Sequence, residues 1–430
     1  MKSFTLSLIG LVSALFLLNS CTKDKCSQTI TYTKYVPQYM SYDELRSSVK
    51  SMPAQSLKNP GKIYLMGNYI FVNEVDKGIH VINNSNPSSP QPISFIQIPG
   101  NIDISAKGNV LYADSYVDLL ALDISNPSNV TVLKRVEDAL PQRRLTSGAS
   151  IDPQKGVVTF YKDEVVTEEI NKDCQIGGGY WGGGPIWMEG DVVNVSSGNM
   201  VPSVFTAAPQ TGVAGSLARF ALNNNTLYVV DDNNLRVFDV STPANPSANG
   251  TAYIGRNIET IFPYNNHLFI GSTNGMFIYN ISNPTAPAYV STYIHGTACD
   301  PVVVDGDYAY VTLRSGTPCN TSLNQLEVVD IKTLSNPVLK HTVQMKNPHG
   351  LGKWGDVLYV CDGNAGLKVM DAQNPETIPA NPVVQVGSIN ATDVIPFNNR
   401  LLMIGTDGLY QYDISNPMQV SYLSRIAVEK

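Results

Sequence analysis

The sequence predicts an all-β protein, a β-propeller of four-stranded blades that follows an N-terminal leader. Two observations carry this prediction: a strand pattern that recurs at intervals of about forty residues, and a composition rich in turn residues. Charged residues make up only 15% of the 430, while 33 glycines and 27 prolines are spread along the chain. Such a composition suits many short strands joined by tight turns and does not suit long amphipathic helices.

The recurring unit contains two strands and a turn, then a third strand that ends in Asp or Asn before a Ser-Asn-Pro-like turn. Within each strand the apolar residues alternate or form short blocks, whereas a helix would place them three and four apart. The Asx residue caps the turn, and proline prevents the ladder from continuing. Seven units carry this marker, at Asn83, Asp123, Asp239, Asn280, Asp330, Asp371 and Asp413.

Third strands such as LRVFD at 235–239 and LKVMD at 367–371 give the repeat its signature. The pattern resembles the LVIVD-repeat family of β-propellers over roughly residues 61 to 428. The chain also resembles a group of Bacteroidetes surface lipoproteins of the same layout. The resemblance implies the fold and indicates no substrate.

The number of blades depends on one long interval. The markers are separated by 40, 116, 41, 50, 41 and 42 residues, so the interval of 116 must hold at least one further unit. Strands expected at 157–161 and 165–170 fit a degenerate third blade. Counting it gives eight blades, and leaving it out gives seven; we predict eight. The propeller then spans 61–430 and carries an insertion around 171–215.

The N-terminus has the pattern of a bacterial export signal. An uncharged apolar run at 4–18 fits a signal-peptide core over 1–20 and is short for a membrane-spanning helix. It ends in Leu-Asn-Ser followed by Cys21, which resembles the lipobox of bacterial lipoproteins. We therefore expect a lipid anchor on Cys21 and a location at the outer membrane or cell surface. The alternative is an ordinary signal peptide with an incidental cysteine.

The segment 21–60 would link the lipid to the propeller. Residues 29–35 alternate like a strand, and 42–49 fit one short helix after a Ser41 cap. Two interpretations remain open for this segment, a stalk or a closing strand contributed to a blade.

Charge and cysteine content narrow the classes of partner. The net charge of −7 argues against a nucleic-acid partner, which requires clustered lysine and arginine. The six cysteines show no CxxC spacing, so zinc is not expected, and we predict no cofactor. Cys299 and Cys319 fall at the same end of an antiparallel strand pair, where a disulfide is a candidate. Cys361 lies within a strand and is interpreted as a buried small hydrophobe.

A possible site emerges when the blades are aligned on their second strands. One position ten residues upstream reads Glu259, Asp300, His349 and Asp393 in four successive blades. Because first strands line the channel of a propeller, these side chains would face one another around its mouth. They could bind a cation or serve as acid and base. The alternative is that strand starts are simply polar and solvated.

A second candidate is the glycine-rich stretch at 177–184, which carries Tyr180 and Trp181. It lacks the Lys-Ser or Lys-Thr ending of a phosphate loop. The two aromatic side chains would stack on a sugar or dock a protein. The alternative is a flexible insertion with two anchoring aromatics.

Together these features favour a non-enzymatic binding scaffold for a protein or a glycan over catalysis. The alternative is a glycan-active hydrolase or lyase with its site at the channel mouth. Against it, sialidase boxes and Ser-His-Asp or metalloprotease motifs are not found in the sequence. Fold alone does not decide between these classes.

Overall fold

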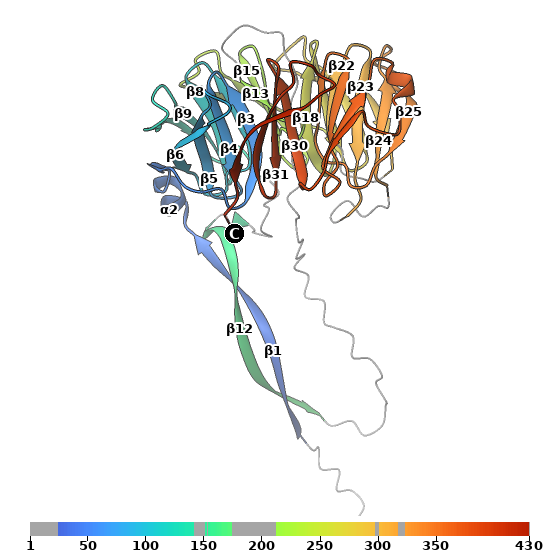
Figure 1. The fold of residues 1–430 in the computed structure, drawn as a ribbon. Coiled ribbons are helices and arrows are strands. Elements are labelled where there is room, and N and C mark those ends of the chain that lie inside the picture. The colour runs from blue at the N-terminus through green and yellow to red at the C-terminus, as the bar shows by residue number, and fades with distance from the viewer. Residues whose placement is uncertain are drawn as a thin grey trace, which may run out of the picture. The chain divides into compact units, whose positions relative to one another are not determined.

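The computed structural model describes residues 25–141, 151–152, 154–173, 212–296, 301–316 and 323–429. The chain divides into two compact units. The larger, Met40–Val157 with Val192–Lys430, contains the propeller. The smaller, Met1–Tyr39 with Val158–Asp191, contains most of a long two-stranded ribbon. Several strands of each unit are labelled in Figure 1.

Seven antiparallel sheets in the larger unit are the blades, each with four consecutive strands ordered from the inside outward. Blades 1 to 3 consist of β3 (Pro60–Met66), β4 (Tyr69–Glu74), β5 (Gly78–Asn83) and β6 (Gln91–Gln97); β7 (Ile104–Lys107), β8 (Val110–Ser115), β9 (Asp118–Asp123) and β10 (Thr131–Val136); and β14 (Phe220–Asn223), β15 (Thr226–Val230), β16 (Asn234–Asp239) and β17 (Ser247–Tyr253). Blades 4 and 5 consist of β18 (Ile258–Tyr264), β19 (His267–Ser272), β20 (Gly275–Asn280) and β21 (Ala288–Ile294); and β22 (Val302–Asp305), β23 (Tyr308–Leu313), β24 (Gln325–Asp330) and β25 (Val338–Gln344). Blades 6 and 7 consist of β26 (Leu351–Trp354), β27 (Val357–Cys361), β28 (Leu367–Asp371) and β29 (Val384–Val386), with the 3-10 helix η2 (Pro375–Thr377) between the last two; and β30 (Ala391–Phe397), β31 (Arg400–Gly405), β32 (Gly408–Asp413) and β33 (Ser421–Ala427).

The predicted β-propeller is therefore confirmed, with seven blades, the count that the sequence left as the alternative. The expected third blade at 157–170 is wrong. Those residues form one strand, β12 (Gly156–Asp173), which lies between β1 (Lys25–Met40) and β11 (Ile151–Asp152) in a separate sheet. The inner strands β7 and β14 contact each other directly, so no blade stands between blades 2 and 3.

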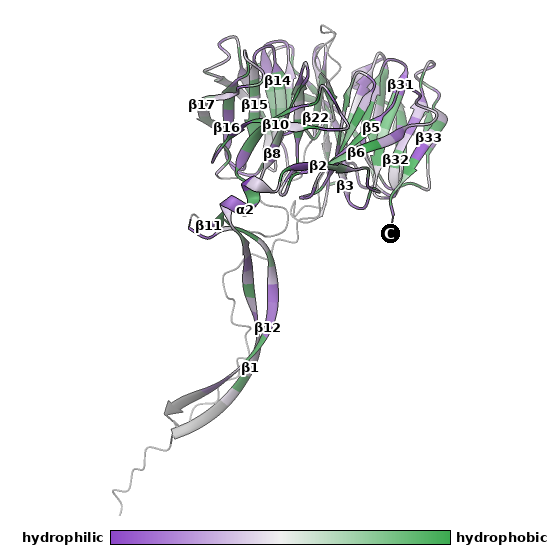
Figure 2. Ribbon diagram, turned by 90° about the vertical axis from the view of Figure 1, so that its left-hand side faces the viewer, coloured by the Kyte–Doolittle hydropathy of each residue, from purple (hydrophilic) through white to green (hydrophobic). Residues whose placement is uncertain are grey.

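The marker residue ends the third strand of every blade in the same way. The side-chain oxygen of each Asp or Asn accepts a hydrogen bond from the backbone N–H two residues later, as Asp123 does from Ser125 and Asp413 from Ser415. The same bond forms in the other five blades. This local bond closes an Asx turn, which explains why the marker was readable from sequence. In Figure 2 the apolar residues follow the blade strands, and the helix α2 (Tyr42–Ser47) is polar.

Hydrogen bonds to these turns connect neighbouring blades. The hydroxyl group of Tyr228 in blade 3 donates to the carbonyl of Pro284 in the turn of blade 4, at 2.9 Å. Tyr112 and Tyr359 make the same bond to the turns of the blades that follow them. Between blades 7 and 1, Ser424 donates to Pro87 instead. The Ser-Asn-Pro-like turn therefore ends a strand in its own blade and supplies a carbonyl acceptor to a side chain of the preceding blade.

The residues before blade 1 pack onto the propeller. Helix α2 begins after Ser41, whose side chain accepts from the N–H of Glu44, so the predicted cap is confirmed. Leu45 of this helix is fully buried and packs with Tyr116 and Val157. The next strand, β2 (Lys50–Pro53), pairs with the outer edge of blade 1. The segment 21–60 therefore does contribute a strand to a blade, and that strand is β2. Strand β1 pairs with β12 instead.

The smaller unit is built around β1 and β12. Cross-strand contacts join Thr31 to Thr167 and the hydroxyl group of Tyr32 to Glu168, at 3.1 and 3.0 Å. Several large apolar side chains of this ribbon are exposed, among them Val165 at 74%. Within the residues that the structure describes, no helix has both the length and the apolar character needed to span a membrane.

Candidate functional site

Of the predicted site residues, Glu259, His349 and Asp393 lie at the start of the inner strands but do not share one register. Glu259 and His349 lie five residues before the end of their inner strand, at Tyr264 and Trp354. Asp393 lies only four residues before Phe397, the end of β30. The strand pairing makes Leu402 the equivalent of Phe269 on the second strand. A position ten residues upstream is Asp393 only if Met403 is set against Phe269 instead. The predicted register of Asp393 is thus wrong by one residue.

Asp393 belongs instead to the neighbouring position, which we call the inner ring position. Each of its members lies four residues before the end of an inner strand. From blade 1 to blade 7 they are Lys62, Asp103, Arg219, Thr260, Pro301, Gly350 and Asp393. The sequence analysis missed Lys62 and Arg219 because it compared the position one residue earlier. Aligning on the hairpin that follows each inner strand would have found them.

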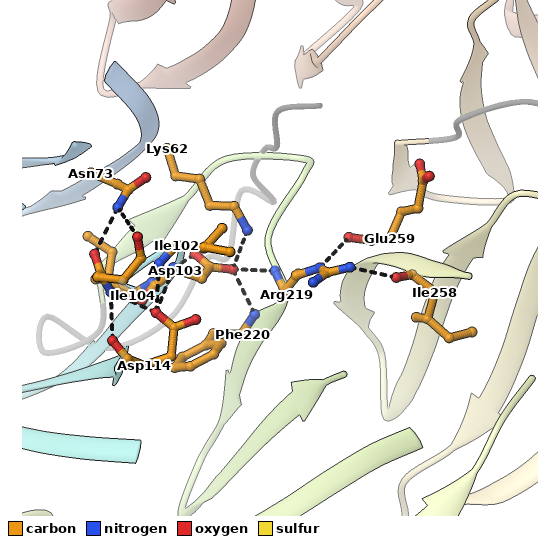
Figure 3. Close-up of polar contacts among 11 residues, drawn as sticks. Lys62, Asn73, Ile102, Asp103, Ile104, Asp114, Arg219, Phe220, Ile258 and Glu259 are labelled. Carbon is orange, nitrogen blue, oxygen red and sulfur yellow. Dashed lines mark hydrogen bonds and ion pairs between the residues drawn. The ribbon is translucent and has the colours of Figure 1, made fainter. Parts of the chain in front are cut away.

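Three charged residues of this ring, Lys62, Asp103 and Arg219, form what we call the charge ladder (Figure 3). The ammonium group of Lys62 lies 2.9 Å from Oδ2 of Asp103, and both side chains are almost fully buried. The same oxygen accepts the backbone N–H groups of Arg219 and Phe220. Oδ1 accepts the N–H of Ile104. Burial lowers the pKa of Lys62 to about 8, even though Asp103 opposes that shift.

The ladder continues from blade 3 into blade 4. The guanidinium of Arg219 donates to the carbonyl oxygens of Ile258, at 2.9 Å, and Glu259, at 3.4 Å. Figure 3 shows the side chain of Glu259 turned away from this contact. Four successive blades are thus connected through paired donors and acceptors, as buried charges require.

The chain itself enters the space that the inner strands enclose. Strand β13 (Val213–Ala214) pairs with the free inner edge of β3. Ser216, which is 1% exposed, accepts the backbone N–H of Leu351 in blade 6. The chain then continues through Arg219 into blade 3. The end of the expected insertion therefore crosses from blade 1 past blade 6 to blade 3 and fills part of the channel.

Asp393 is fully buried beside the ladder. Its Oδ1 accepts the N–H of Val394 at 2.7 Å, while the buried Oδ2 has no hydrogen-bond partner. Burial raises the pKa of this carboxyl well above its ordinary value; the charge of Asp103 adds to the shift, and that of Lys62 opposes it. A neutral carboxyl is the form that suits such a place.

His349 is held rigidly at the start of blade 6. The backbone N–H of His349 donates to the carbonyl oxygen of Cys361, and the backbone carbonyl of His349 accepts a hydrogen bond from the hydroxyl group of Thr312, both at 2.6 Å. The imidazole Nε2 lies 3.1 Å from the side-chain amide of Asn347, and Nδ1 is buried without a partner. Burial, together with the charge of Arg314, lowers the pKa of His349 to about 3. The imidazole is therefore a neutral group at physiological pH.

Arg314, which sequence analysis also missed, follows β23 in blade 5 and is 8% exposed. Burial lowers the pKa of its guanidinium, and the charge of Glu259 acts in the opposite direction. The charge of Glu259 thus acts on Arg314, and that of Arg314 acts on His349, across blades 4, 5 and 6. A single arginine after a strand has no distinguishing pattern, so no sequence signal marked it.

Several expected site residues lie outside the described residues. They are Cys21, Tyr180, Trp181, Cys299, Asp300 and Cys319. Among the ranges that the structure does describe, no three His, Cys, Asp or Glu side chains are placed to hold a metal ion. Cys361 is fully buried, as expected.

Comparisons with known proteins agree with this architecture. A sequence model of the LVIVD repeat matches residues 60–94, 101–138, 214–252, 255–294 and 295–345, which correspond to blades 1 to 5. No curated protein matches the chain.

Among solved structures, the computationally designed protein Ika8 is similar, with 9% identity, a TM-score of 0.49 and coverage of 87% of this chain and 92% of that one. BamB from Moraxella catarrhalis has 9% identity and a TM-score of 0.45, covering 90% and 97%. Hsv2p of Kluyveromyces lactis has 10% identity and a TM-score of 0.45, covering 84% and 93%. Likeness of this degree carries no functional information.

Proposed function

Because the chain is a β-propeller of LVIVD repeats, we propose that it is a non-enzymatic binding scaffold of the bacterial cell envelope, held by a lipid on Cys21. Its partner on this proposal is a protein, bound on the outer surface of the propeller. A glycan is the alternative ligand.

The observation that carries this proposal is that the two carboxyl groups at the inner ring position, those of Asp103 and Asp393, are enclosed within the fold. Asp103 is committed to Lys62 and to backbone N–H groups. Asp393 is fully buried. A glycosidase needs two carboxyl groups that reach the substrate, whereas these two are enclosed. This favours binding on the outside over hydrolysis at the channel.

The outer strands offer a surface suited to a protein partner. Tyr253, Tyr289 and Tyr422 lie on the outermost strands of blades 3, 4 and 7 and are 67%, 59% and 62% exposed. Tyrosine contributes a large rigid contact area together with a hydrogen-bonding group, and it is enriched in protein interfaces. We refer to these three residues as the rim tyrosines.

Photo-crosslinking in cells tests the proposal. A photoreactive amino acid at each rim position should give a discrete adduct with one envelope protein. The same amino acid at Asn224, an exposed turn residue between β14 and β15, is the matched control and should give none. Adducts from Asn224 alone would contradict the rim as the binding surface. Release of new sugar ends from a polysaccharide panel by the purified chain would instead establish the enzymatic alternative.

The anchor has its own test. Replacing Cys21 by serine should prevent incorporation of labelled fatty acid and release the protein from the membrane fraction, because acyl chains supply the membrane affinity. Cys26→Ser is the control for a nearby cysteine and should retain both properties. Unchanged labelling in the Cys21→Ser variant would show that the lipid is attached elsewhere or is not present.

A further inference from the structure

We propose that Arg314 and His349 form a binding site for a small carboxylate ion at the start of blades 5 and 6. The site is defined by two groups, which we call the open donor pair. One is Nδ1 of His349, which is buried without a partner, and the other is the guanidinium of Arg314, which is nearly buried and makes no hydrogen bond to any described residue. This inference does not depend on the proposed scaffold function, since it concerns a small ligand at the channel and not the outer strands.

Arg314 is the first member of the pair. It is the only arginine among the buried polar residues of the described chain, at 8% exposed. No hydrogen bond or ion pair from its guanidinium to any described residue is present. By contrast, the more exposed arginines 46, 135, 219, 236 and 425 each bond to a carboxylate or a carbonyl. A guanidinium has five donors and normally fills them when it is buried.

His349 supplies the second donor. The amide of Asn347 donates to Nε2, so in this arrangement the ring proton resides on Nδ1. That nitrogen is buried and has no acceptor. Since the pKa of His349 is lowered to about 3, Nδ1–H is a neutral donor throughout the physiological range. The backbone bonds to Cys361 and Thr312 hold the ring in place.

The fold brings the two donors to one place. The side chain of Thr312 points toward blade 6, because its hydroxyl group donates to the carbonyl oxygen of His349. Arg314 lies two residues further along the same strand direction, and side chains two apart share a face. The effect of the Arg314 charge on the pKa of His349 agrees with this placement. We infer that the guanidinium of Arg314 and Nδ1 of His349 lie close together at the boundary of blades 5 and 6.

The chemistry of the pair selects a carboxylate. A guanidinium presents two parallel N–H groups that match the two oxygens of a carboxylate. The pair carries one positive charge, and the negative charge of Glu259 acts on Arg314 as well. A singly charged anion therefore suits the site better than doubly charged phosphate. The slight exposure of Arg314 limits the ligand to a small one.

Saturation-transfer NMR on the methyl protons of acetate tests the inference, with the full chain in nonionic detergent and a buffer free of other carboxylates. Acetate should bind saturably in the millimolar range, and formate should compete while phosphate should not. Arg314→Gln should abolish the signal, and His349→Phe should weaken it several-fold. Arg256→Gln, which changes an exposed arginine, should leave it intact. Unchanged thermal unfolding of each variant shows that the fold is retained.

Three results would overturn the inference. One is no saturable acetate signal in the unmodified chain. Another is a signal that survives Arg314→Gln at full strength. The third concerns Asp300, which lies outside the described residues. If acetate binds only after Asp300→Asn, a carboxylate of the chain itself occupies the guanidinium, and no external ligand is needed.

Discussion

Blades 1 to 4 and blades 5 to 7 both place ionisable groups at the start of their inner strands, but they satisfy them differently. In the first set, Lys62, Asp103 and Arg219 connect blade to blade, and each has an acceptor or a donor. In the second set, Nδ1 of His349 and Oδ2 of Asp393 are buried without partners. The difference separates charges that are paired within the fold from buried polar atoms that are left without a partner.

The physical reason lies in the cost of burial. A buried polar atom without a partner costs free energy, so folded proteins retain few of them. Where a set is fully paired, structural support explains it completely. Where pairing is incomplete, the fold bears a cost that support alone does not explain. This contrast makes the open donor pair, and not the charge ladder, the better candidate site.

Removing the centre of the charge ladder should have the largest effect. In Asp103→Ala the Lys62 charge and the N–H groups of Arg219 and Phe220 lose their acceptor, so we expect the free energy of unfolding to fall by about 3–5 kcal/mol. Urea unfolding measures this change. The control is Glu137→Ala, which removes a largely exposed partner of Arg46 and should cost about 0–1 kcal/mol. Equal losses in the two variants would mean that the ladder adds no special stability.

The connection to blade 4 should matter less. Arg219→Met removes the hydrogen bonds to Ile258 and Glu259, and bonds from a charged donor are worth about 1.5–3 kcal/mol each in net stability. We expect a loss in the lower part of that range, because one of the two bonds is long. Arg256→Met, at an exposed position, should change stability by less than about 0.5 kcal/mol. A loss no greater than the control would show that blades 3 and 4 do not need this bond.

The features that could be predicted from the sequence are those that form between residues close together in the chain. The Asx turns at Asp123 and Asp413 form within a few residues, so composition and spacing revealed the seven repeat units that carry the marker. The sequence at 156–173 also predicts β-structure. Its partner strand lies at 25–40, however, and pairing between strands so far apart in the chain leaves no pattern in the sequence. The predicted eighth blade was wrong for this reason.

The candidate site shows the same division. The positions of Glu259 and His349 follow from repeat spacing, which places equivalent residues at equivalent heights in successive blades. Asp393 was assigned one residue out of register because Met403 and Leu402 are both apolar and only strand pairing distinguishes them. The state of Arg314 depends on which acceptors surround it in three dimensions. No property of the residue itself or of its neighbours in sequence carries that information.

Asp393 allows the contrast to be measured as a function of pH. Above a pKa of about 3.9 the carboxyl ionises in the unfolded chain, while in the folded protein burial raises its pKa and the proton is retained. The folded state then binds more protons, so this residue makes the free energy of unfolding fall as pH rises. Asp393→Asn should remove that contribution. The variant should therefore gain stability relative to the unmodified chain from pH 4 to pH 8, as measured by urea unfolding in a pH series. A constant difference across the series would contradict a buried neutral carboxyl.

Arg314→Met should have the smallest effect on stability and is the most discriminating of the four substitutions. The side chain is buried, and its guanidinium makes no bond to any described residue, so removing it loses no hydrogen bond and relieves the cost of burying a charge. Methionine has a comparable length and fills irregular space well. The free energy of unfolding should stay within about 0.5 kcal/mol of the unmodified value or rise above it, in contrast to Arg219→Met. A loss of the size expected for Arg219→Met would mean that Arg314 already has an acceptor and belongs with the structural charges of blades 1 to 4.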